Sequence, residues 1–145
     1  MKPRILIFED NDMLCSTLKA ILGELGYEVH PFSNPAMCPL YYGTDHNCLL
    51  DHPCSDIIIS DINMPFENGV QFIRNLLNKG CKVKFRALMS AGWTKSDLQF
   101  AESIGCRVFN KPFNLDEMIK WLSDCRKHID QKRVLSDWPM KERVG

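Results

Sequence analysis

The sequence predicts a doubly wound α/β domain, in which a five-stranded parallel sheet carries helices on both faces. Two observations lead to this fold class. Short apolar runs alternate with helical patterns along most of the chain, and such alternation implies right-handed crossovers between parallel strands. Residues 57–59 are three consecutive isoleucines, and a continuous β-branched run of this kind is typical of a strand buried on both faces.

The expected strands are apolar runs bounded by polar residues, and they cover residues 4–8, 27–32, 57–60, 83–90 and 107–110. The expected helices repeat apolar side chains every three or four residues, and they cover residues 12–25, 69–79, 95–104 and 115–129. Side chains that can cap a helix precede three of them: Asn11 or Asp12, Thr94 or Ser96, and Asn114. A glycine suited to a left-handed stop follows three of them, at Gly26, Gly80 and Gly105.

One segment interrupts this alternation. Residues 33–55 contain three prolines and three cysteines and show no strong helical period, although 39–50 could hold a short helix. We therefore expect a single domain over residues 1–132, in which the cysteine-bearing segment 36–55 replaces a regular second helix. Residues 133–145 are expected to form a C-terminal tail.

Composition and charge argue against two classes of partner. The chain has 18 Lys+Arg and 18 Asp+Glu among 145 residues, so its formal net charge is zero, whereas a nucleic-acid surface normally needs a basic excess. No apolar stretch approaches the roughly 20 residues of a membrane span, and the first residues do not form a signal peptide. We expect a cytoplasmic protein with no nucleic-acid or membrane partner.

The residues with chemical potential stand at the carboxyl ends of the predicted strands. Glu9 and Asp10 follow the first strand, Asp61 follows the third, Ser90 ends the fourth and Lys111 follows the fifth. These ends share one edge of a parallel sheet, which is where open α/β folds bind ligands. Three acids at one point repel one another unless a cation lies among them, and oxygen ligands suit Mg²⁺. A hydroxyl and an ammonium group facing that cation would bind an anion such as a phosphoryl group.

Each of these residues alone has an ordinary structural role, as a helix cap, a turn residue or a solvated charge. Their combination at four strand ends is what indicates a site. The motifs there are the acid pair after Ile-Leu-Ile-Phe, Asp-Ile-Asn-Met-Pro, Met-Ser-Ala and Lys-Pro-Phe. Together, over residues 4–130, they resemble the receiver domain of two-component response regulators.

The resemblance implies a flavodoxin-like fold with strand order 2-1-3-4-5 and a signalling switch rather than an enzyme, although a receiver assists its own phosphorylation and dephosphorylation. It implies that Asp61 accepts a phosphoryl group from a sensor histidine kinase or a phosphotransfer protein. The Mg²⁺ ligands that it implies are Glu9, Asp10, Asp61 and the backbone carbonyl of Asn63. Lys111 would contact the phosphoryl oxygens, and Ser90 would turn toward the phosphate.

The resemblance also implies that an unknown output protein docks near the fourth and fifth strands and the last helix. Trp93 and Trp121 are candidates for that contact, with core packing as the alternative. The aromatic switch residue of the family lies three residues before the lysine, which here is Val108, while Phe109 is adjacent. Either the fifth strand is shifted and Phe109 serves, or the aromatic coupling is absent.

The cysteines are a second departure from the family pattern. One hypothesis is a Zn²⁺ or iron–sulfur site formed by Cys38, Cys48, Cys54 and Cys81, with Cys106, His46 or His52 as substitutes. No Cys-x-x-Cys pair is present, and the alternative is unligated, partly buried thiols. This hypothesis leads to a second function, a metal- or redox-sensing module whose input is the cysteine-rich edge.

A third interpretation is an aspartate-nucleophile phosphatase, which also uses a strand-end Asp, a Ser or Thr, a Lys and Mg²⁺. Such enzymes usually have a second acid two residues after the nucleophile, where this chain has Asn63. The acid pair on the first strand also favours the receiver, so the phosphatase ranks last.

Overall fold

The computed structural model describes residues 2–33, 52–64, 68–112 and 114–136. Its five parallel strands are β1 (Arg4–Phe8), β2 (Glu28–Phe32), β3 (Ile57–Asp61), β4 (Phe85–Ser90) and β5 (Arg107–Asn110). The described helices are α1 (Asp12–Glu24), α3 (Gly69–Asn78), α4 (Lys95–Ser103) and α5 (Leu115–Lys127). The strand order is β2-β1-β3-β4-β5, which confirms the predicted doubly wound fold. None of the described helices is long and apolar enough to cross a bilayer.

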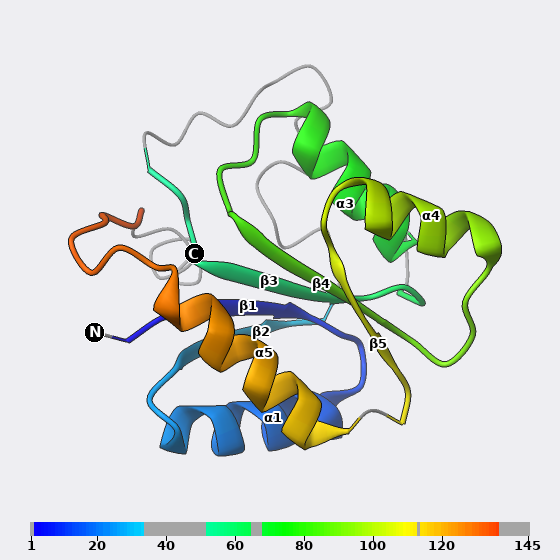
Figure 1. Cartoon of the computed structure of the whole chain (residues 1–145). Coiled ribbons are helices and arrows are strands. Elements are labelled where there is room, and N and C mark those ends of the chain that lie inside the picture. Colours follow the sequence, from blue (N-terminus) through cyan, green and yellow to red (C-terminus); the bar gives the residue numbers. More distant parts are fainter. Residues whose placement is uncertain (1, 34–51, 65–67, 113, 137–145) are drawn as a thin grey trace.

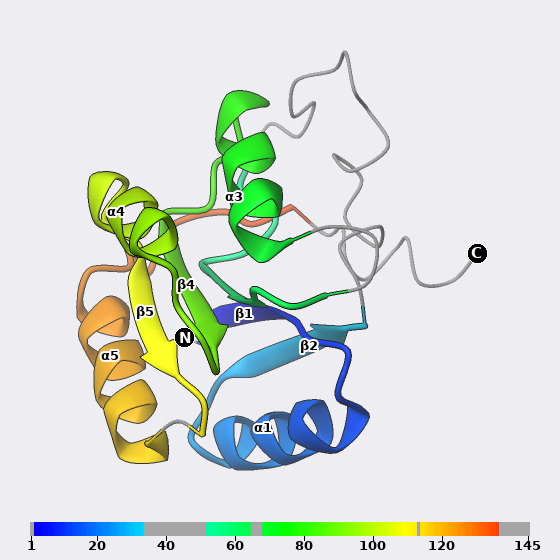
Figure 2. The same cartoon turned by 90° about the vertical axis from the view of Figure 1, so that its right-hand side faces the viewer.

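The sheet separates two apolar cores. Helices α1 and α5 cover one face, and α3 and α4 cover the other (Figures 1 and 2). Because successive side chains of a strand point to opposite faces, Ile5 and Ile7 enter the first core while Leu6 and Phe8 enter the second. Every residue of β1 and β3 is buried. The central strands therefore hold the carboxyl edge of the sheet in a rigid position.

Most helix ends follow the predicted signals. The side chains of Asn11, Thr94 and Asn114 cap α1, α4 and α5. Gly26, Gly80 and Gly105 all have positive φ, as the left-handed stop requires. Two predicted elements were too long by two residues. Strand β4 begins at Phe85 rather than residue 83 because its partner β3 begins opposite it at Ile57, and α5 ends at Lys127 rather than residue 129.

After α5 the chain folds back onto the amino edge of the sheet. We call residues 130–136 the C-terminal strap. The Arg133 guanidinium donates to both carboxylate oxygens of Asp56, at 2.8 and 2.7 Å. The Ser136 backbone N–H donates to the Pro53 carbonyl at 2.8 Å, and the Arg4 guanidinium donates to the Ser136 carbonyl at 2.6 Å. The strap is therefore tied to the starts of β1 and β3.

The two outermost strands of the sheet are β2 and β5. Strand β2 contains Pro31, which has no backbone N–H to donate and which sheets accept at their edges. Strand β5 has only four residues. Each outer strand pairs with one neighbour, and its free edge is poorly suited to pairing with a further strand.

Candidate functional site

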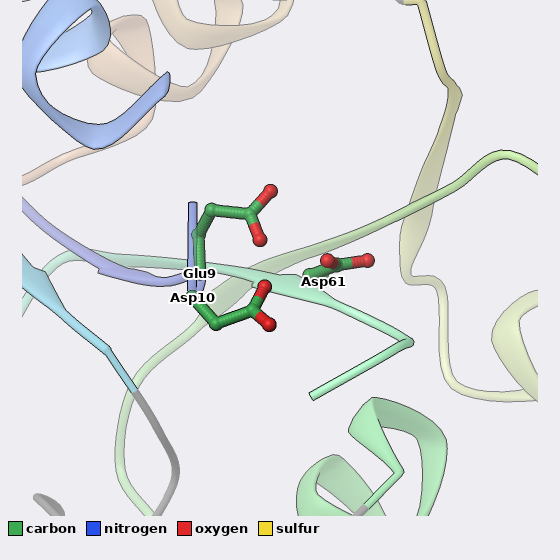
Figure 3. A group of neighbouring side chains, drawn as sticks. All are labelled: Glu9, Asp10 and Asp61. Atoms are coloured by element: carbon green, nitrogen blue, oxygen red, sulfur yellow. The ribbon is translucent and has the colours of Figure 1, made fainter. Parts of the chain in front are cut away.

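Three carboxylates meet at the carboxyl edge of the sheet. Glu9 and Asp10 follow β1 directly, and Asp61 is the last residue of β3. One oxygen of each lies within 4.8 Å of the others, and Figure 3 shows the Glu9 and Asp10 side chains extending toward Asp61. Glu9 is fully buried and Asp61 is 4% exposed, whereas Asp10 is exposed. Within the described ranges this is the only group of three or more acidic, histidine or cysteine side chains arranged to hold a metal ion.

Lys111 joins this cluster from the end of β5. Its Nζ donates to Asp61 Oδ2 at 3.0 Å and to Glu9 Oε1, and its backbone N–H donates to the Ser90 carbonyl at 2.8 Å. Burial alone would lower the pKa of Lys111, but the hydrogen bonds to the two carboxylates outweigh burial and raise it. The lysine is therefore a fixed cation facing the acids.

Glu9 is the carboxylate of the cluster whose burial is least compensated by hydrogen bonds. Burial raises its pKa to about 7, and the neighbouring Asp61 adds to that effect while Lys111 opposes it. Its Oε2 is buried and has no hydrogen-bond partner among the described residues. A buried carboxylate oxygen without a donor is costly, and a hard divalent cation would satisfy it. The residues present therefore fit Mg²⁺.

The side chains around the cluster are buried and lie in the field of several negative charges. The Cys15 thiol on α1 donates to the Glu9 carbonyl at 3.3 Å. Burial raises the pKa of Cys15 to about 11, and the charges of Glu9 and Asp12 contribute to the rise. Cys15 is therefore a neutral packing residue beside the site.

The position of Asp61 depends on a residue that sequence reasoning missed. The backbone N–H of Gly69 donates to the Ile62 carbonyl at 2.8 Å, and a Cβ on Gly69 would lie 2.2 Å from the Asp61 carbonyl oxygen. On the other side, the Asn63 backbone N–H donates to Asp61 Oδ1 at 3.1 Å. The sequence held one signal that could have revealed this contact: Gly69, a poor helix former, is the first residue of a helix, directly after the N-cap Asn68.

Ser90 lies at the same edge, but its hydroxyl faces the following loop. Its Oγ donates to the Gly92 carbonyl at 2.8 Å and accepts from the Gly92 backbone N–H at 3.1 Å. The side chain is fully buried. The structure therefore brings Glu9, Asp10, Asp61 and Lys111 together and holds Ser90 beside them in a separate hydrogen-bonded turn.

The two candidate aromatic-switch positions lie on opposite faces of β5. Val108 pairs with Leu88 and packs against the core under α3 and α4. Phe109 is buried on the other face, with its ring 5.8 Å from that of Trp121 in an edge-to-face contact. Strand β5 is therefore not shifted in a way that would bring Phe109 to the position of Val108.

The cysteine site gains no support from the described residues. Cys54, Cys81 and Cys106 pack against the core under α3 and α4, and no described thiol belongs to a group that could hold a metal ion. Cys38, Cys48 and His46 lie outside the described ranges.

The fold and the site together define a class of protein, namely a doubly wound domain that presents three acids and a lysine at the carboxyl edge of its sheet. The family model described as the response regulator receiver domain matches residues 5–123. The chain belongs to this family of two-component signalling proteins, whose members act as switches.

Individual relatives are distant. The alkaline phosphatase synthesis transcriptional regulatory protein SphR of Synechococcus elongatus is 26% identical over 120 residues, which cover 80% of this chain and 46% of that regulator. The chain thus spans less than half of that relative. The receiver domain of the Francisella response regulator 1452 has a TM-score of 0.70 at 20% identity, covering 88% of this chain and 98% of its own. The chemotaxis protein CheY4 of Vibrio cholerae has a TM-score of 0.66 at 21% identity, covering 86% and 99%. The two structures support the fold.

Proposed function

We propose that this chain is a phosphorylation-activated switch that accepts a phosphoryl group on Asp61, with Mg²⁺, from a sensor histidine kinase or a phosphotransfer protein. The observation that carries the proposal is the pairing of two features. The Lys111 ammonium lies against Glu9 and Asp61, and a buried Glu9 oxygen beside it lacks a donor. The Lys111 ammonium is thus one cation at the site, and the three carboxylates have the oxygens to bind a metal ion as a second.

Glu9, Asp10 and Asp61 would hold the Mg²⁺, with the backbone carbonyl of Asn63 as a further ligand. When bound, the ion would offset the negative charge that the phosphoryl oxygens carry during transfer. Asp61 is the nucleophile: one of its oxygens forms a bond to phosphorus as the bond between phosphorus and the donor breaks. The Asn63 N–H holds the other side of that carboxylate, and Lys111 supplies a positive charge to the phosphoryl oxygens.

The first test is phosphoryl transfer to the protein itself. We expect one phosphoryl adduct by intact mass after incubation with Mg²⁺ and acetyl phosphate, and none with Asp61→Asn, because the amide is not a nucleophile for this step. The matched control is Asp12→Asn, which removes an exposed carboxylate of α1 near the site and should leave the adduct intact. An adduct of equal yield on Asp61→Asn would overturn the proposal.

A second expected result concerns pH. Because the pKa of Glu9 is raised to about 7 in the metal-free protein, Mg²⁺ must displace a proton from it at lower pH. Affinity for Mg²⁺ should therefore rise as the pH increases through 7, by roughly tenfold between about pH 6 and about pH 8. Without metal the sign is reversed: a raised carboxyl pKa makes the free energy of unfolding decrease as the pH rises toward 7.

Calorimetric titration with Mg²⁺ at the two pH values measures this difference directly. Glu9→Gln is the control variant, since its side chain cannot ionise and its weaker binding should show much less pH dependence. Equal affinity of the unsubstituted protein at both pH values would contradict a Glu9 pKa of about 7 in the metal-free site.

The output partner, the domain boundary and the location that the sequence predicts are further proposals. The output protein would dock near β4, β5 and α5, where Trp121 lines a shallow hollow with Arg107, Lys120 and two acids. The domain boundary at residue 132 stays a proposal, and the contacts of Arg133 and Ser136 with the amino edge of the sheet favour counting residues 133–136 with the folded part. A cytoplasmic location stays a prediction. No described contact favours the metal- or redox-sensing alternative.

A further inference from the structure

Trp93 lies in the loop between β4 and α4, three residues beyond the end of β4. Its ring is half-buried and packs against the core under α3 and α4. Its Nε1 is buried and has no hydrogen-bond partner among the described residues. An indole N–H usually finds an acceptor when it is buried. Trp93 is therefore held in a position that leaves its donor unsatisfied, and a movement that exposes the N–H to water would relieve that cost.

The loop that carries Trp93 is fixed at both ends. At one end, Ser90 Oγ makes two hydrogen bonds with the backbone of Gly92. At the other, Thr94 caps α4 in a capping box, with Asp97 N–H donating to Thr94 Oγ1 at 3.0 Å. Only residues 91–93 lie between β4 and this cap. A change at Ser90 is thus confined to a short segment that ends in Trp93.

The Ser90 hydroxyl has a single proton, and at present that proton is donated to the Gly92 carbonyl. Ser90 follows Met89, the residue paired with Asp61 in the sheet. A phosphoryl group on Asp61 would offer new acceptor oxygens at this edge. If Ser90 donates to one of them, its bond to the Gly92 carbonyl breaks, and that carbonyl belongs to the peptide unit that continues into Trp93. Gly92 is exposed, and no atom lies within 4 Å of the site of a Cβ, so the released peptide has room to move.

The neighbouring strand has no aromatic side chain on this face. Val108 occupies that place in β5 and packs, like Trp93, against the core under α3 and α4, while Phe109 is committed to Trp121 on the opposite face. Trp93 is thus the aromatic residue next in sequence to the Ser90 turn. Among the described residues at this edge, it is the only aromatic side chain with a buried polar atom that lacks a hydrogen-bond partner.

We propose that Trp93 is the switch residue of this chain: phosphorylation of Asp61 draws Ser90 away from Gly92, and the indole leaves its half-buried position and becomes exposed. The inference rests on the proposed function, since it needs a phosphoryl group on Asp61. It goes further in naming the side chain that moves, the hydrogen bonds that break, and the surface that changes.

The experiment uses two proteins that each keep one informative indole. Trp121→Phe combined with Trp138→Phe leaves Trp93, and Trp93→Phe combined with Trp138→Phe leaves Trp121 as the matched control. The probe is Mg²⁺ with beryllofluoride, which mimics a phosphoryl group on a carboxylate, and its occupancy is followed by ¹⁹F NMR. The readouts are the emission maximum and the quenching of the indole by acrylamide, before addition and at saturation.

We expect the Trp93 protein to show a red shift and an increase of about twofold in its quenching constant at saturation, because a half-buried ring roughly doubles its contact with solvent when it is exposed. The Trp121 control should change little. Adding Ser90→Ala to the Trp93 protein should remove the response when samples are compared at equal ¹⁹F occupancy.

Two outcomes would overturn the role of Trp93 and leave the proposed function standing: saturation without a change in Trp93, or a response that persists in Ser90→Ala. If beryllofluoride does not bind and acetyl phosphate gives no adduct, the proposed function fails, and the inference with it.

Discussion

Replacing Gly69 with alanine is expected to lower the free energy of unfolding by about 3 kcal/mol, because the new methyl group cannot be accommodated by a side-chain movement. Its Cβ would lie 2.2 Å from the carbonyl oxygen of Asp61 and 2.9 Å from the Cα of Ile62, and both are backbone atoms. The end of β3 must then shift. A displacement of about 1 Å at a reacting group can cost about 100-fold in rate, so the rate of phosphorylation by acetyl phosphate should fall by that order.

Gly23→Ala is the matched control for this experiment. Gly23 lies within α1, and no atom lies within 4 Å of the site of its Cβ. Alanine is the better helix former, so this substitution should be neutral or raise stability by up to about 1 kcal/mol and leave phosphorylation unchanged. Chemical denaturation and adduct formation, measured on both variants, separate the two cases. Normal phosphorylation in a stable Gly69→Ala protein would contradict the close packing at Asp61.

Asp56→Ala is expected to destabilise the domain by about 3 kcal/mol, the lower end for a buried ion pair, since it leaves Arg133 uncompensated but that side chain is 21% exposed and can regain water. Asp56 is 7% exposed and accepts from Nε and Nη2 of Arg133 and from the Arg4 backbone N–H, the last at 2.8 Å. The substitution therefore removes three charge-assisted hydrogen bonds at once. Urea denaturation of the variant measures the loss.

A double-mutant cycle with Arg133→Met tests whether the pair itself is responsible. The double variant should lose less than the sum of the two single variants, because neither charge is then left alone. Asp124→Ala is the control. Asp124 is 58% exposed and lies 3.7 Å from Lys127, so its removal should change stability by no more than about 0.5 kcal/mol. Equal losses for Asp56→Ala and Asp124→Ala would show that the strap does not stabilise the fold.

The strands and the site were predictable because both follow from short local signals. Each of the residues with chemical potential stands at the end of a strand or directly after it, so the parallel arrangement alone brings Glu9, Asp61 and Lys111 to one edge. The caps Asn11 and Asn114 are equally local.

Three features could not be predicted, because each depends on contacts between distant residues. Arg133 reads as part of a polar tail, and only the folded chain brings it to Asp56, 77 residues earlier. The need for a glycine at position 69 arises from the approach of α3 to β3, which no periodicity reveals. The unsatisfied donor of Trp93 likewise appears only when its neighbours are in place.

The two outermost strands have a consequence for the behaviour of the protein in concentrated solution. An exposed strand edge is a template on which a second chain can add a strand and begin a fibril. In β2, Pro31 interrupts the row of backbone donors, and β5 presents only four residues, with the charged Arg107 at its start. Neither outer strand offers a long, continuous row of hydrogen-bonding groups. We therefore expect the folded domain to resist edge-to-edge aggregation even though its central strands are almost entirely apolar.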